Sequence, residues 1–308
     1  MTQRARILGV GQFEAPAGRI PYLFLPDRGL FARRAERLHR LADGHALGEY
    51  LALLAKLAAA QQEVLDRFPA VPLPGAREQA LCSENHMPLL AANSWRRDSA
   101  WREGLHLILR RMQQETLPSA AQQTITGLTQ APAALLELVA DKILAGDLGE
   151  VVPGELPFVA AALQVYWLHM ALELGEQTFA RSEEVGVCPV CGSYPTAGVV
   201  RSGGTENGLR YLCCSLCSTQ WHLVRLKCSS CETTEGIDYY LLEGLDSAIK
   251  AESCSACGTY LKLLYLEKDT RMEALADDLA SLSLDILLAA KGCMRGGPNL
   301  FLHPGEVS

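Results

Sequence analysis

The sequence predicts an α+β fold with an all-helical N-terminal domain, two small metal-binding modules and a C-terminal helix. Apolar residues recur at helical spacing through residues 30–179. Beyond Val187, Cys, Gly, Ser and Thr replace the helix formers, and nine of the 11 cysteines lie between Cys188 and Cys257. Helical periodicity returns at residues 271–291. These observations place the boundaries at residues 1–182 for the helical domain, 183–226 and 227–267 for the two modules, and 268–308 for the C-terminal helix with an irregular tail.

The N-terminal domain is expected to contain about five to seven helices. Ser94 is expected to cap a helix that continues through Met112. Pro132 is expected in the first turn of a helix that Gly146 ends. One face of the first helix carries four arginines, which we interpret as a solvated face: Arg33, Arg34, Arg37 and Arg40. The expected helices span residues 30–41, 45–68, 94–112, 132–144 and 156–179.

In the modules and the C-terminal segment, the sequence patterns that predict secondary structure are shorter. Runs rich in β-branched and aromatic residues predict strands at residues 209–212, 221–226, 237–242 and 260–265. The final helix should carry one apolar face, and we expect it to pack back on the helical domain or on the modules. This face consists of Leu275, Leu279, Leu282 and Ile286.

Four C-x-x-C pairs form an internal repeat. Each cysteine of the first two pairs has a counterpart 40 positions later, so each half reads C-x2-C, 22 residues, C-x2-C. This is close to the spacing of four-cysteine zinc ribbons, in which two tight turns complete a tetrahedron of thiolates. Gly192 and Gly258 follow second cysteines, where such a turn favours positive φ. The predicted metal ligands are Cys188, Cys191, Cys214, Cys217, Cys228, Cys231, Cys254 and Cys257.

We expect pairing within each half, but a crossed pairing stays open because only ten residues separate the second C-x-x-C pair from the third. Cys213 is interpreted as a non-ligand, since its counterpart is Ser253. His222 is interpreted as a surface or packed histidine. Cys82 and Cys293 are most simply a buried thiol and a tail thiol. Metal loss is expected to unfold residues 185–265 and to leave the helical domain folded.

Four protein thiolates would fill each site and leave no open position for activating water. No nucleophile–base pair or phosphate-binding loop stands out elsewhere, so we do not expect an enzyme. Tetrahedral thiolate sites accept zinc or iron, and the spacing does not separate the two metals. Such a site is structural, or with iron it carries one electron.

Charge and hydropathy limit the kinds of partner that the chain is expected to bind. The net charge of -7 argues against nucleic acid or an anionic membrane. Between Cys188 and Glu267 eight acidic residues oppose six basic ones, and each divalent four-thiolate site adds negative charge. Residues 158–174 are interrupted by Gln164 and His169, which favours a buried helix over a membrane-inserted span. Residues 1–18 resemble no signal peptide, and paired C-x-x-C motifs indicate a reducing compartment.

Three classes of function fit two four-cysteine modules. A zinc-ribbon nucleic-acid-binding protein conflicts with the acidic modules. A rubredoxin-like electron carrier needs iron near the surface and leaves the large helical domain without a role. A protein-binding factor would use the metal-stapled modules as a rigid platform beside that domain, and it is the class we favour.

Several segments resemble the formate dehydrogenase accessory protein FdhE family, densely over residues 185–290. They include Cys188-Pro-Val-Cys-Gly-Ser, Gly208-Leu-Arg-Tyr-Leu-Cys-Cys-Ser-Leu-Cys, Lys227-Cys-Ser-Ser-Cys and Ala276-Asp-Asp-Leu-Ala. All eight C-x-x-C cysteines match the family pattern, whereas Cys213 stands where that pattern tolerates other residues.

The resemblance implies rubredoxin-like modules that hold two iron ions, one per module, with zinc as the alternative. It implies a cytoplasmic, non-enzymatic maturation factor that binds the catalytic subunit of respiratory formate dehydrogenase before export and is needed for its activity. Self-association into a homo-oligomer stays open, as does the surface that binds the client.

Overall fold

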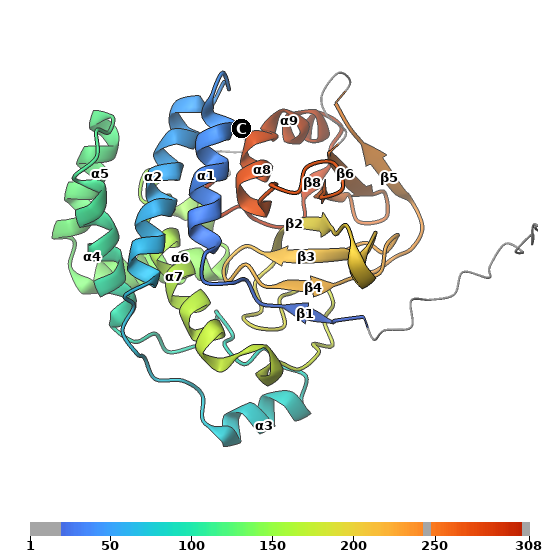
Figure 1. Ribbon diagram of the computed structural model, residues 1–308, viewed down its shortest axis with the longest axis horizontal. Helices are drawn as coiled ribbons and strands as arrows, with labels where there is room; N and C mark the ends of the chain where they lie inside the picture. The colour runs from blue at the N-terminus through green and yellow to red at the C-terminus, as the bar shows by residue number, and fades with distance from the viewer. Residues whose placement is uncertain (1–19, 243–247, 304–308) are drawn as a thin grey trace, which may run out of the picture.

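Helices and one sheet form the two sides of the molecule, which confirms the expected α+β class. The computed structural model describes residues 20–242 and 248–303. Residues 1–18, and Glu243 and Asp246 from the charge count, lie outside the described residues. In Figure 1 helices α1, α2, α4 and α5 stand together on the left, the sheet lies on the right, and α8 and α9 sit above it.

Seven α-helices lie before residue 175 in the described part of the chain, within the expected number. They are α1 (Leu30–Ala42), α2 (Gly48–Leu65), α3 (Ala76–Glu84), α4 (Ala100–Met112), α5 (Ser119–Gln130), α6 (Ala133–Ala145) and α7 (Leu156–Leu174). Helix α7 is buried from Leu156 to Ala171. No helix among the described residues is both long and apolar enough to span a membrane.

Several expected helix boundaries are wrong. Helix α7 ends at Leu174 rather than at residue 179, and Gly175 follows it with a positive φ of 77°. Helix α4 begins at Ala100, and Ser94 lies in a turn before it. At the observed start of the helix the Asp98 carboxylate accepts from the Ala100 amide at 2.9 Å, which satisfies one of the free amides of the first turn. Pro132 lies just before α6 rather than in its first turn, whereas Gly146 ends that helix at φ 85° as expected.

The strands form a single sheet in which the 40-residue repeat is visible. Strands β2 (Pro195–Val200), β3 (Arg210–Cys214) and β4 (Gln220–His222) recur, one repeat later, as β5 (Ile237–Tyr240), β6 (Ile249–Cys254) and β7 (Thr259–Tyr265). The order is β1-β4-β3-β2-β7-β6-β5, with β1 (Leu23–Phe24) on one edge and β8 (Met294–Arg295) paired to β7. The two modules therefore join through the parallel pair β2–β7.

Four of these strands were predicted, and two central ones were missed. The predicted strands are β3, β4, β5 and β7, although β4 stops at His222. Strand β2 contains small residues, among them Gly198, where a Cβ atom would lie 2.4 Å from Leu263 of β7. Strand β6 contains polar residues, because its Glu252 forms a buried ion pair with Arg210 of β3. Neither strand contains an aromatic residue, whereas each of the four predicted runs contains at least one.

The expected C-terminal helix is broken in two at Ser281. Helix α8 (Ala274–Ala280) and helix α9 (Leu282–Ala290) flank this residue, and the Ser281 hydroxyl donates to the Asp277 carbonyl at 2.8 Å. The single apolar face is therefore wrong: Leu279 is 1% exposed but Ile286 is 70% exposed. The expected packing is confirmed, because α8 contacts both α1 and β2.

The interpretation of the α1 arginines as a solvated face is wrong for two of the four. Arg34 is 1% exposed and donates to Glu273 at 2.9 Å. Arg37 pairs with Asp277 at 2.5 Å and with Asp269 at 2.8 Å. These ion pairs join α1 to α8 and to the residues just before it. Arg33 and Arg40 do lie at the surface, in exposed ion pairs.

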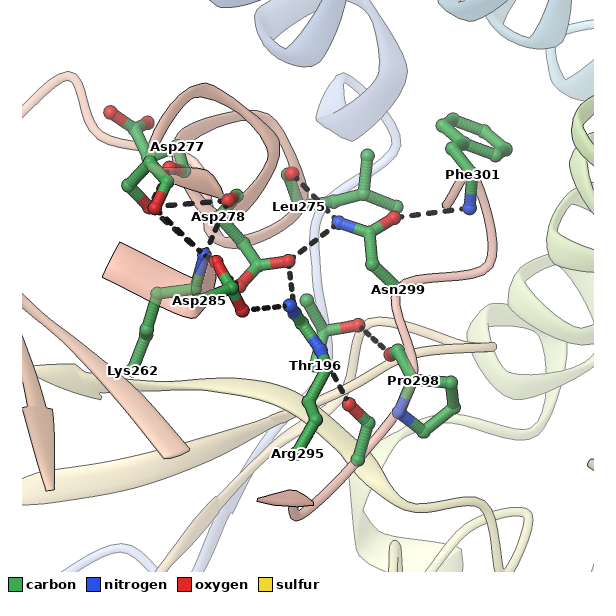
Figure 2. A network of polar contacts seen from close by, with 12 residues as sticks. Thr196, Lys262, Leu275, Asp277, Asp278, Asp285, Arg295, Pro298, Asn299 and Phe301 are labelled. Atoms are coloured by element: carbon green, nitrogen blue, oxygen red, sulfur yellow. Dashed lines mark hydrogen bonds and ion pairs between the residues drawn. The ribbon is translucent and has the colours of Figure 1, made fainter. Parts of the chain in front are cut away.

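A second buried network fastens the second module to the C-terminal helices (Figure 2). Lys262 of β7 lies 3.0 Å from Asp278 of α8 and also pairs with Asp285 of α9. Arg295 of β8 pairs with both carboxylates, and the Asn299 amide donates to Asp278 at 2.8 Å. Burial alone would raise the pKa of Asp278, but Lys262 and Arg295 hold it below its ordinary value. Lys262, one of the six basic residues counted between Cys188 and Glu267, is thus buried in this network and is not exposed on the module surface.

Candidate metal centres

The structure gathers the eight predicted cysteines into two groups of four. Within each group all four sulfur atoms lie within 4.8 Å of one another. Each group combines the two C-x-x-C pairs of one half of the repeat, so the crossed pairing is wrong. The groups are Cys188, Cys191, Cys214 and Cys217, and Cys228, Cys231, Cys254 and Cys257.

The sulfur spacing fits one tetrahedral metal ion per group. Four metal–sulfur bonds of about 2.3 Å give sulfur–sulfur edges of about 3.8 Å. In the first group the sulfur atoms of Cys188 and Cys217 are 3.5 Å apart. In the second group those of Cys228 and Cys257 are 3.7 Å apart. Each cluster could therefore bind a metal ion, and four thiolates suit iron and zinc alike.

Local backbone geometry explains why these sulfurs converge. The residue after the second cysteine of every C-x-x-C pair has positive φ, which turns the chain back toward its start. The four residues are Gly192 at 75°, Ser218 at 57°, Glu232 at 63° and Gly258 at 72°. The positive φ expected at the two glycines is confirmed. Backbone amides also point at the sulfurs, as at Cys217, whose N–H donates to Cys214 Sγ at 3.4 Å. Such donors favour the thiolate.

Two threonines that the sequence analysis missed belong to these sites. Thr219 Oγ1 lies 3.1 Å from Cys217 Sγ, and Thr259 Oγ1 lies 3.0 Å from Cys257 Sγ. Partial burial alone would raise the pKa of Cys257, but the hydrogen bonds from Thr259 lower it to about 7. The two threonines are 40 positions apart, so extending the repeat beyond the cysteines would have found them.

The chemistry of the first group calls for a cation. Burial raises the pKa of both Cys188 and Cys214 well above the ordinary value for a thiol. Four thiolates in such a place are stable only beside a compensating charge, which a divalent or trivalent metal ion would supply.

Comparisons with known proteins find the same family along nearly the whole chain. Residues 20–184 match the family model described as FdhE, N-terminal, residues 187–225 match the FdhE central domain, and residues 226–302 match the FdhE C-terminal domain. The chain belongs to the FdhE family. It is 44% identical to the FdhE homolog of Stutzerimonas stutzeri and 42% identical to that of Pseudomonas aeruginosa, and in both cases the match covers 97% of this chain and 98% of the relative.

The fold agrees with a solved FdhE structure. The crystal structure of the FdhE protein from Pseudomonas aeruginosa superimposes with a TM-score of 0.85 at 41% identity. The match covers 93% of this chain and all of that one. Both the helical side and the sheet are thus parts of a fold shared with an FdhE protein.

The two clusters of this FdhE-family chain differ in exposure. In the first group every cysteine is between 0% and 2% exposed, as Cys191 is at 1%. In the second group Cys228 and Cys254 are buried, but Cys257 is half-buried and Cys231 is exposed. The repeat in sequence therefore produces two sites in unlike surroundings.

The remaining candidate residues lie apart from both clusters. Cys213 is buried, and its thiol points toward the Ser218 carbonyl at 3.8 Å; burial raises its pKa to about 12. His222 is half-buried, with its ring 5.4 Å from that of Tyr211, and burial lowers its pKa. Cys82 is half-buried rather than buried, and Cys293 lies in the C-terminal segment beyond α9, as expected of a tail thiol, where it is half-buried.

Proposed function

We propose that this chain is an accessory factor for respiratory formate dehydrogenase. It binds the catalytic subunit in the cytoplasm, before export, and is needed for that subunit to become active. Membership of the FdhE family over nearly the whole chain carries the proposal, because the match spans all three family models. The proposed client, formate dehydrogenase, follows from the resemblance of the cysteine segments to formate dehydrogenase accessory proteins.

The site chemistry supports a binding factor over an enzyme. Each cluster would hold one metal ion, iron first and zinc as the alternative, with all four coordination positions filled by protein. The cysteines would fix the knuckles and strands in place, so that little conformational entropy is lost when a client protein binds. The residues of the two modules would thus hold a binding surface for the client in a fixed shape. No catalytic proton or group transfer is assigned to them.

A nucleic-acid-binding role is less well supported. Contact with phosphates requires exposed arginine and lysine side chains. Four of the basic residues that the sequence offered are instead engaged in buried or half-buried ion pairs: Arg34, Arg37, Arg210 and Lys262. These side chains hold the fold together and are not free to meet a phosphate backbone.

Electron transfer is the second candidate, favoured by the exposure of Cys231. An iron ion in that cluster would lie near the surface, as a rubredoxin-like carrier requires. A reversible one-electron couple in the purified iron protein would support this reading, and its absence would leave the accessory role alone.

Co-purification tests the accessory role. The tagged intact protein should recover the catalytic subunit from formate-grown cells, and deletion of its gene should abolish formate oxidation. A Cys213→Ser variant is the matched control and should behave like the parent, because Cys213 lies outside both clusters. The proposal fails if no catalytic subunit is recovered and formate oxidation survives the deletion.

A further inference from the structure

The residues between the paired cysteines differ in kind between the two sites. In the first site Pro189, Val190 and Leu216 lie between the cysteines, and all three are buried. Their counterparts 40 positions later are Ser229, Ser230 and Ala256, of which the last two are exposed. Apolar side chains therefore seal the first site into the core, whereas small residues leave the second site uncovered.

The helical side also holds both knuckles of the first site directly. The amides of Leu90 and Ala92 donate to the carbonyls of Val190 and Cys191 at 2.9 and 2.8 Å. From α7, the Gln164 amide donates to the Ser215 carbonyl at 2.9 Å. Opening this site would break these bonds and expose core side chains.

The C-x-x-C turns of the second site receive no such hydrogen bonds from the helical side among the described residues. Ser255, the counterpart of Ser215, is exposed, and both its amide and its hydroxyl donate to Gly236 of the same module. The neighbouring C-terminal segment contacts this site at its edges: the Met294 amide donates to the Gly258 carbonyl at 2.8 Å, and a Cβ atom at Gly296 would lie 3.2 Å from Ser230 Oγ. Cys231 thus stays open to solvent.

We infer that the two clusters have different roles: the first is a structural site that keeps its metal ion, and the second is an exchangeable metal site. An external thiolate, or a chelator with comparable donors, would reach a metal ion in the second site on its Cys231 side. Its donor atom would bond to the metal as the metal–Cys231 bond breaks, and the released Cys231 thiolate would take a proton from water. No electron is transferred in this exchange. The inference goes beyond the accessory role and does not depend on the identity of the client.

Metal release from the intact chain tests the inference. The full-length protein, loaded with zinc under anaerobic conditions, is challenged with excess EDTA while released zinc is followed with a colour indicator. One zinc equivalent should leave quickly and the other at least about tenfold more slowly, because the first site must open part of the core. Cys231→Ser should lack the fast phase and keep one slow equivalent, and Cys213→Ser should keep both phases.

Alkylation of the parent protein is a second, independent measurement, and it needs no variant. With iodoacetamide present during the EDTA challenge, mass spectrometry should find Cys231 and Cys257 modified in the fast phase. The four first-site cysteines should be modified only in the slow phase. Release of both zinc ions in one phase, or early modification of Cys188 or Cys191, would overturn the inference.

Discussion

At the scale of single residues, one buried arginine ties together parts that are distant in the sequence. The Arg34 guanidinium on α1 donates to Glu273, to Gln164 of α7 and to Ser218 of the first module. A buried charge is costly unless it is paired and hydrogen-bonded, and here each partner comes from a different element. Arg34 therefore helps fix how the helices, the first module and α8 fit together.

Replacing this residue should be costly. Arg34→Ala removes the partner of Glu273 and should lower the free energy of unfolding by about 3–5 kcal/mol. Arg33→Ala on the same helix is the matched control. It breaks an exposed pair with Asp27 and should cost less than about 1 kcal/mol. Denaturant unfolding of both metal-loaded variants measures the difference, and equal losses would contradict the assigned role of Arg34.

A buried histidine should make stability depend on pH. His169 on α7 is 5% exposed, with its ring 5.0 Å from that of Phe68, and burial lowers its pKa below 6.5. As the pH falls through about 6.5 the unfolded chain gains a proton that the folded chain does not, so stability falls until the lower folded pKa is reached.

His169→Phe should therefore weaken the loss of unfolding free energy between about pH 7.5 and about pH 5.5. Denaturant unfolding at several pH values, on parent and variant, measures the two slopes. His222 has a lowered pKa as well, so part of the slope should remain. An unchanged slope would show that His169 is protonated equally in both states.

Sequence reasoning succeeded for the cysteines and failed for the arginines, for one physical reason. A C-x-x-C pair carries its own turn, and its partner pair follows at a fixed interval, so the spacing favours one cluster in each half of the repeat. The partners of Arg34 and Arg37 are far away in the sequence: Glu273 is 239 positions from Arg34, and Asp277 is 240 positions from Arg37. Periodicity within α1 contains no information about them.

At the scale of elements, the repeat specifies each three-strand unit but not how the units join. Strands β2 to β4 and β5 to β7 follow one pattern, yet the units meet through the first strand of one and the last strand of the other. The close approach at Gly198 and the Arg210–Glu252 pair bring these units together. Both are tertiary contacts, and strands β2 and β6, which lack the aromatic residues of the predicted runs, were missed because such contacts stabilise them.

Removing the second metal should loosen specific strands. Strands β5 and β6 lie at one edge of the sheet; β6 ends at Cys254 of the second site, and Ile237 of β5 pairs with Cys254. With the second metal chelated, hydrogen exchange should speed up in β5 and β6, while α7 in the main core keeps its protection. Hydrogen exchange with mass spectrometry measures both segments in one sample. An equal increase of the exchange rate in α7 would contradict the proposal that the second metal ion stabilises only its own module.

At the scale of the whole molecule, the helices and the first module share one hydrophobic core. Cys188, Val190 and Leu216 belong to the same buried cluster as Leu90 and Trp167. The expectation that metal loss would unfold residues 185–265 and spare the helical domain is therefore at odds with the structure. We expect loss of the first metal to weaken the entire molecule, and loss of the second to act locally.

The most direct test of the account is the metal content of the protein purified without oxygen, by elemental analysis together with its absorption spectrum. We predict two metal equivalents per chain, with each single Cys→Ser variant at the eight cluster positions losing about one of them. Cys213→Ser should retain both. One equivalent in the parent protein, or disulfides in place of metal, would contradict the assignment of two four-cysteine metal sites.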